Sequence, residues 1–189
     1  MKKKGPWSFP VEEFSAIRMA IVREEEEVND TKALREKLSL PPIEHIGVVV
    51  RDMEKAVEYY SSVFGLGPFD VYGFEPEKQW FREKPSSFKL QLGKARWGDI
   101  VLELIQPLEG ESLHKDFLDT HGEGMQHLGF LVPDYEETFD KFVKAGFAPL
   151  TRAEMYVESP KGNLKACYFD TRRVGGIIFE VVWRSWVNS

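Results

Sequence analysis

The sequence lacks the features that define several large classes of protein. It contains one cysteine, Cys167, in 189 residues, which excludes an internal disulfide framework and a zinc site built from cysteines. No apolar run approaches the about 20 residues of a membrane helix. The basic residues at 2–4 are followed by prolines and glutamates rather than by the apolar run of a signal peptide. We therefore expect a cytoplasmic protein that does not act on membranes.

Basic residues are in the minority. The chain has 25 Lys and Arg against 31 Asp and Glu, and its formal net charge is −6. Binding to nucleic-acid phosphates requires clustered Lys and Arg side chains, and an acidic chain disfavours it. We therefore expect that nucleic acid is not the main partner.

What the chain does contain is a repeated pattern, at Ile43–Asp52 and again at Met125–Asp134. In both copies a histidine is followed by one apolar residue, a glycine, three apolar residues, a gap of one, and an aspartate suited to cap a helix. A stretch with helical spacing of apolar residues follows each copy. The repetition predicts two similar modules, each of which covers the open sheet of the other.

The rest of the chain can be assigned around this repeat. We predict an N-terminal helical extension at 1–42, a first module at 43–110, a linker at 111–124 and a second module at 125–189. The first module has the order strand, helix and three or four strands, and the second has the order strand, helix and three strands. The predicted fold class is α+β, with two tandem βαβββ modules that form paired curved sheets. The later strands are expected near 69–74, 80–81, 88–92 and 100–105 in the first module, and near 147–151, 164–170 and 177–182 in the second.

Each module also ends with an acidic residue inside an apolar strand. These residues are Glu103 in the run VLELI and Glu180 in the run IIFEVV. A lone histidine at a strand start is usually a core residue, and a lone strand glutamate usually faces solvent. The recurrence of both types in both modules favours a shared site, because a buried carboxylate is costly unless it is paired or binds a metal. We therefore predict that His45, Glu103, His127 and Glu180 bind a divalent ion such as Zn, Ni, Co, Mn or Fe.

Other residues are weaker candidates. His114 and His121 have no counterpart in the repeat and are expected at the surface or in loops, and Cys167 is expected to fill the core. Glu123 lies in a predicted glycine-rich turn and is a candidate to face the site. Candidate pocket walls, each also suited to the core, are Trp80, Phe81, Phe88, Trp97, Phe130 and Tyr168. Candidate cations for an anionic substrate, each also suited to the solvated surface, are Arg82, Lys84, Lys89 and Arg96.

Taken together, these motifs resemble the vicinal oxygen chelate superfamily over about 43–183. The two His-x-Gly strands, the two strand-borne glutamates and the duplicated order carry the resemblance. The four predicted ligands look like the ligand set of glyoxalase I and are similar to that of methylmalonyl-CoA epimerase. The runs Glu103–Leu108 and Phe117–His127 are specifically similar to the epimerase. The chain departs from both enzymes in the long aromatic stretch 72–98 and in the turn 170–176.

The resemblance implies a metal-dependent lyase, isomerase or epimerase that abstracts a proton next to a carbonyl and forms an enediolate. Glu103 and Glu180 would then be both ligands and catalytic groups, with Glu180 preferred as the general base. The substrate would be a small molecule such as a glutathione or coenzyme A thioester, and a homodimer is compatible with the resemblance. Two alternatives stay open: an extradiol-type Fe(II) dioxygenase that uses His45, His127 and Glu180, and a non-catalytic binding protein of the bleomycin-resistance type.

Overall fold

The computed structural model describes residues 38–187. The predicted N-terminal helical extension therefore lies almost entirely outside the described residues. The described residues after Ser39 belong to one compact unit. No helix among them is long and apolar enough to cross a membrane.

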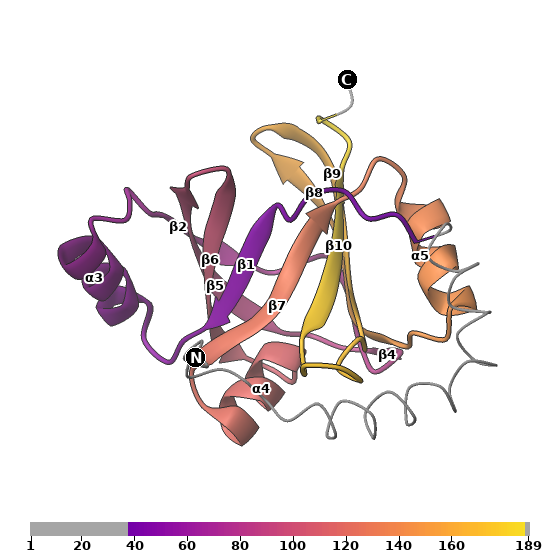
Figure 1. Ribbon diagram of the computed structural model, residues 1–189, viewed down its shortest axis with the longest axis horizontal. Helices are drawn as coiled ribbons and strands as arrows, with labels where there is room; N and C mark the ends of the chain where they lie inside the picture. Colours follow the sequence, from indigo (N-terminus) through magenta and orange to yellow (C-terminus); the bar gives the residue numbers. More distant parts are fainter. Residues whose placement is uncertain (1–37, 188–189) are drawn as a thin grey trace, which may run out of the picture. The chain divides into compact units, whose positions relative to one another are not determined.

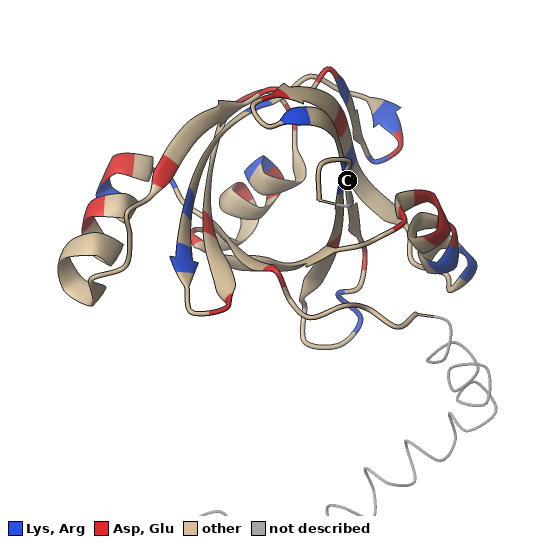
Figure 2. Cartoon of the chain, turned by 90° about the horizontal axis from the view of Figure 1, so that it is seen from above, with Lys and Arg blue, Asp and Glu red and all other residues tan. Residues whose placement is uncertain are grey.

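The described chain forms a single ten-stranded sheet in the order β2-β5-β6-β1-β7-β10-β9-β8-β3-β4. The sheet is strongly curled (Figure 1, Figure 2). The strands of the first half of the chain are β1 (His45–Val49), β2 (Asp70–Phe74), β3 (Lys78–Phe81), β4 (Lys84–Pro85), β5 (Lys89–Trp97) and β6 (Ile100–Glu109). Those of the second half are β7 (Gly124–Leu131), β8 (Pro149–Glu158), β9 (Lys161–Phe169) and β10 (Ile178–Arg184).

The pairing of the strands repeats across the centre of the sheet. Strand β1 is parallel to β6 and β7 is parallel to β10, while β1 and β7 pair antiparallel with each other. Strands β5 and β2 then extend the first half antiparallel, as β9 and β8 extend the second. The predicted α+β fold with duplicated modules and curved sheets is confirmed.

Three helices are described: α3 (Met53–Phe64), α4 (Leu113–His121) and α5 (Tyr135–Lys144). Both predicted caps are present, because the side chain of Asp52 accepts from the backbone N–H of Lys55 and that of Asp134 accepts from Glu137. Helices α3 and α5 lie on the outer side of the curl (Figure 2), and α3 buries Met53 against the strands beneath it. The repeated aspartate thus starts an equivalent helix in each half.

One strand lies in a different place from the sequence prediction. Residues 80–81 were assigned to the sheet of the first module, but β3 pairs antiparallel with β8, at the far edge of the second half. The guanidinium of Arg152 on β8 lies 4.7 Å from the centre of the Trp80 ring, and Gln79 is buried. The β3–β4 hairpin therefore covers an edge that β8 would otherwise expose.

Candidate metal site

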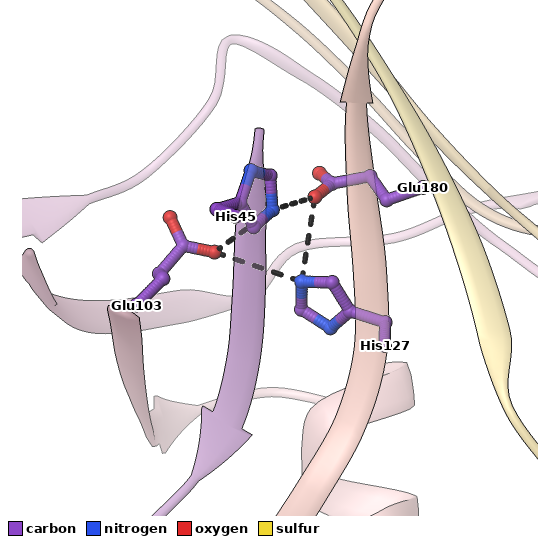
Figure 3. Close-up of side chains that lie close together, drawn as sticks. All are labelled: His45, Glu103, His127 and Glu180. Carbon is purple, nitrogen blue, oxygen red and sulfur yellow. Dashed lines mark hydrogen bonds and ion pairs between the residues drawn. The ribbon is translucent and has the colours of Figure 1, made fainter. Parts of the chain in front are cut away.

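The four predicted ligands lie together on the four central strands. His45 is on β1, Glu103 on β6, His127 on β7 and Glu180 on β10 (Figure 3). One ligand atom from each residue lies within 4.8 Å of the other three, and all four residues are buried. The structure therefore brings together the whole set that the sequence predicted.

Gly47 and Gly129 make room for the histidine rings. A Cβ on Gly47 would lie 1.9 Å from Cε1 of His127, and a Cβ on Gly129 would lie 1.9 Å from Cε1 of His45. The strand register explains this, because Gly47 pairs with His127 and Gly129 pairs with His45. Each glycine of the His-x-Gly pattern thus leaves space for the histidine ring of the other half.

The atoms that could bind a metal ion face one another across short distances. Nε2 of His45 lies 2.7 Å from Oε2 of Glu180 and 3.6 Å from Oε2 of Glu103. Nε2 of His127 lies 3.4 and 3.7 Å from the same two oxygens. This nitrogen makes no hydrogen bond although the residue has no exposed surface. A buried polar atom without a partner destabilises the fold. A cation between these nitrogen and oxygen atoms would provide the missing partner.

The charges in the cluster favour a cation. Burial raises the pKa of Glu103, but the charges of Lys94 and His45 outweigh burial and hold this pKa well below its usual range. Burial also raises the pKa of Glu180, but the neighbouring rings of His127 and His45 lower it overall. Conversely, burial lowers the pKa of His45, whereas Glu103, Glu180 and Glu44 raise it to about 10. The carboxylates are thus ionised, and the site attracts positive charge.

Two imidazole nitrogens and two carboxylates that converge in a buried position suit a borderline divalent metal ion. His45 illustrates the fit. When Nε2 of His45 carries no proton, this nitrogen and the Glu180 oxygen both present lone pairs. Their 2.7 Å separation therefore requires a proton or a metal ion between them. The residues present therefore fit the predicted ion.

A cavity of about 720 Å³ opens onto the cluster. His45, Glu103 and Glu180 line it, and its walls include apolar residues such as Phe74, Leu90 and Leu92. Three cations also line it: Lys94, Arg96 and Arg184. Lys94 lies 2.8 Å from Oε1 of Glu103, and Arg184 lies 3.0 Å from Oε1 of Glu44. Arg96 makes no ion pair among the described residues. The cavity is therefore lined by residues of the cluster, by apolar side chains and by Arg96, a cation that no carboxylate neutralises among the described residues.

The sequence predicted few of the cavity residues. Among the six aromatic candidates only Tyr168 lines the cavity; Phe88 and Phe130 are core residues, and Trp97 is 57% exposed. Among the four cation candidates only Arg96 lines it. Lys94 and Arg184 were missed. A signal for Lys94 was available, because it is two residues before Arg96 on the same strand and so shares its face.

His114 is not a surface residue, and that prediction was wrong. It is 1% exposed, and its Nδ1 lies 2.8 Å from Oε1 of Gln126, because α4 packs against the start of β7. His121 is exposed, as predicted. Cys167 is fully buried, and burial raises the pKa of its thiol, in agreement with a core role. Glu123 does not join the cluster, since its carboxylate accepts from the backbone N–H of Arg51.

The chain is similar in sequence to known proteins. Residues 44–168 match the family model described as the Glyoxalase/Bleomycin resistance protein/Dioxygenase superfamily. An uncharacterized protein of Bacillus subtilis (strain 168), YqjC, is 29% identical over 139 residues, which are 74% of this chain and 89% of that protein.

Solved structures share the fold. A methylmalonyl-CoA epimerase variant from Streptomyces coelicolor, in complex with 2-nitronate-propionyl-CoA, superposes with a TM-score of 0.57 at 22% identity, covering 80% of this chain and 99% of that chain. A variant of 4-hydroxymandelate synthase from Streptomyces coelicolor superposes with a TM-score of 0.54 at 21% identity, covering 77% and 49% of the two chains.

Proposed function

Because the chain belongs to the glyoxalase, bleomycin resistance protein and dioxygenase superfamily, we propose that it is a metal-dependent enzyme that removes a proton from a carbon next to a carbonyl group. The reaction would be an epimerisation, an isomerisation or a related lyase step. The observation that carries this proposal is the buried cluster of two histidines and two glutamates beneath a cavity, with one histidine nitrogen left without a partner.

His45, Glu103, His127 and Glu180 would hold the metal ion. A divalent ion supplies Lewis-acid stabilisation of the negative charge that develops on substrate oxygens when a carbon acid loses its proton. The two carboxylates differ in their surroundings. Glu103 is tied to Lys94, which keeps it ionised and makes it a weak base.

Glu180 is the better candidate for the general base. No Lys or Arg pairs with it among the described residues, and its Oε2 is hydrogen-bonded to Nε2 of His45. Glu180 would act as the base through a carboxylate oxygen that the ion does not hold, because an oxygen bound to a cation is a weaker base. Glu180 also lines the cavity, so it can reach a substrate carbon there.

The cavity suits a small molecule with an apolar part and an anionic group. Arg96 and Lys94 lie on one face of β5 and both line the cavity. Because Lys94 is already paired with Glu103, Arg96 is the cation available to a substrate anion. A coenzyme A or glutathione thioester has this character, and the similar epimerase structure has a coenzyme A derivative bound.

Replacement of Arg96 by glutamine is expected to raise KM for an anionic thioester by about tenfold or more, because a charge-assisted hydrogen bond contributes about 1.5–3 kcal/mol. The value of kcat should change little, since Arg96 does not contact the ligand cluster. Steady-state kinetics checks this result. Lys84→Gln is the matched control, because Lys84 is exposed on β4 and does not line the cavity. Equal KM values for the two variants would contradict the role of Arg96.

The proposed function is tested by metal analysis together with a screen for proton exchange. Purified protein stripped with a chelator should regain about one equivalent of Zn, Ni, Co, Mn or Fe per chain. Its apparent stability should rise by about 2.7 kcal/mol when the free ion is at 100 times Kd. The loaded protein should then exchange the proton next to the carbonyl of a thioester with deuterated solvent, as followed by NMR.

Other outcomes of the same experiment favour the alternatives. Oxygen uptake with a catechol that depends on ferrous iron would show a dioxygenase. Tight binding of an aromatic compound by the metal-free protein, with no exchange and no metal bound, would show a binding protein. Either result would overturn the proposed proton abstraction.

A further inference from the structure

The residue that precedes each histidine of the cluster contacts the outward nitrogen of that histidine. Nδ1 of His45 lies 2.5 Å from Oε2 of Glu44, and Nδ1 of His127 lies 3.2 Å from Oε1 of Gln126. An ionised carboxylate can only accept a hydrogen bond. His45 therefore carries its proton on Nδ1 and directs Nε2 toward the cluster.

The orientation of the Gln126 amide follows from its other contact. Its Nε2 donates to the backbone carbonyl of Leu113 at 3.1 Å. Because a carbonyl oxygen cannot donate, the NH₂ group must face Leu113, and Oε1 must face the histidines. Oε1 also lies 2.8 Å from Nδ1 of His114. The amide oxygen thus accepts from two imidazoles, and His127 also carries its proton on Nδ1.

This arrangement accounts for the polar atom of the cluster that has no partner. With the proton of His127 on Nδ1, its Nε2 is a bare lone pair that faces Glu103 and Glu180, which are acceptors as well. While the ring is neutral, no hydrogen bond can form among these atoms, whereas each of them can bind a cation.

Glu44 is itself held in place. Its second oxygen, Oε1, accepts from Nη1 of Arg184 at 3.0 Å. His114, which supports Gln126, is buried beside His127, with ring centres 6.1 Å apart. The two histidines of the cluster thus have different partners: an anionic one held by an arginine, and a neutral amide shared with a second histidine.

We propose that Glu44 and Gln126 are the positioning residues of the metal site, each fixing the tautomer and the orientation of the histidine that follows it. This inference rests on the proposed metal-dependent function. Partners of this kind raise the metal affinity of a histidine by about 10–100-fold. Because Glu44 is charged and Gln126 is neutral, His45 is the stronger of the two imidazole ligands.

The test compares four variants of the full chain by Co²⁺ affinity, measured against a competing chelator. Gln126→Ala should weaken binding by about 10–100-fold. Gln126→Glu should restore only part of it, because one carboxylate oxygen accepts from His127 while the other faces the Leu113 carbonyl, to which the amide donates. Glu44→Gln keeps an acceptor but loses the charge, so a loss of about tenfold is expected. Gln79→Ala is the matched control, since Gln79 is also buried and hydrogen-bonded to the backbone, but lies on β3 and contacts none of the four cluster residues through its hydrogen bonds.

A second measurement separates positioning from a loss of stability. Nitrogen-15 NMR of the metal-free protein, at a pH high enough for His127 to be neutral, should show its proton on Nδ1 in the wild type and a mixture of tautomers in Gln126→Ala. Unchanged tautomer and unchanged affinity in that variant, or an equal loss in Gln79→Ala, would overturn the proposal. Wild-type protein that binds Co²⁺ but exchanges no substrate proton would instead reject the proposed function and leave the positioning role standing.

Discussion

Replacement of Gly129 by alanine is expected to lower the affinity for a divalent ion by at least about 100-fold, more than the loss of an outer hydrogen bond to a ligand would cause. The new Cβ would lie 1.9 Å from Cε1 of His45 and 2.2 Å from its Nε2. The ring must therefore turn away from the cluster, and it cannot do so without losing its contact with Glu180. Gly47→Ala should have the same effect on His127.

The measurement is a metal titration of each variant, with Gly73→Ala as the control. Gly73 is also a strand glycine that lines the cavity, but a Cβ there meets no atom within 4 Å. Thermal unfolding should show that Gly129→Ala costs about 1–3 kcal/mol, as is usual for overpacking. If Gly129→Ala bound the ion as tightly as Gly73→Ala, the reciprocal fit between glycine and histidine would not matter for the site.

Replacement of Glu180 by glutamine is expected to slow exchange of the substrate proton by about 10²–10⁴-fold, the usual contribution of a general base. The amide keeps an oxygen that can face the ion but cannot accept the proton. Metal binding should therefore be largely retained while exchange is lost. Deuterium incorporation from solvent, followed by NMR on a metal-loaded sample, gives the rate directly.

Glu158→Gln is the control for this prediction, because Glu158 also lines the cavity but is exposed and is not one of the four ligands. Glu103→Gln provides a useful contrast. It also keeps an oxygen that can face the ion, but it leaves Glu180 in place as the base and Lys94 without its carboxylate partner. Exchange that continued at the wild-type rate in Glu180→Gln would exclude this residue as the base and transfer the role to another group.

Features that depend on neighbouring residues were predictable. The aspartates at 52 and 134 cap helices, as the repeat indicated, because a cap is a contact between residues three apart. The four residues of the buried cluster were predictable for a related reason: alternation along a strand and recurrence in two modules mark the residues that face one site. The repeat also predicted the duplicated curved sheet, since each module needs the other to cover its strands.

Features that depend on pairing between distant strands were not predictable. The sequence did not show that β3 would join β8, that Lys94 would lie opposite Glu103, or that His114 would be buried beside Gln126. Each of these depends on strand register or on how a helix packs, and a slip of one residue turns every side chain of a strand to the other face.

The sequence by itself therefore determined which residues could bind a metal ion and that they occur twice, because residue types and their spacing are local properties. Only the tertiary structure decided which residues of one copy contact the histidine of the other. It placed the glycine of each half beneath the histidine of the other and gave one histidine an anionic partner and the other a neutral one. The physical reason is that β1 and β7 pair antiparallel, so each motif is completed by the opposite strand.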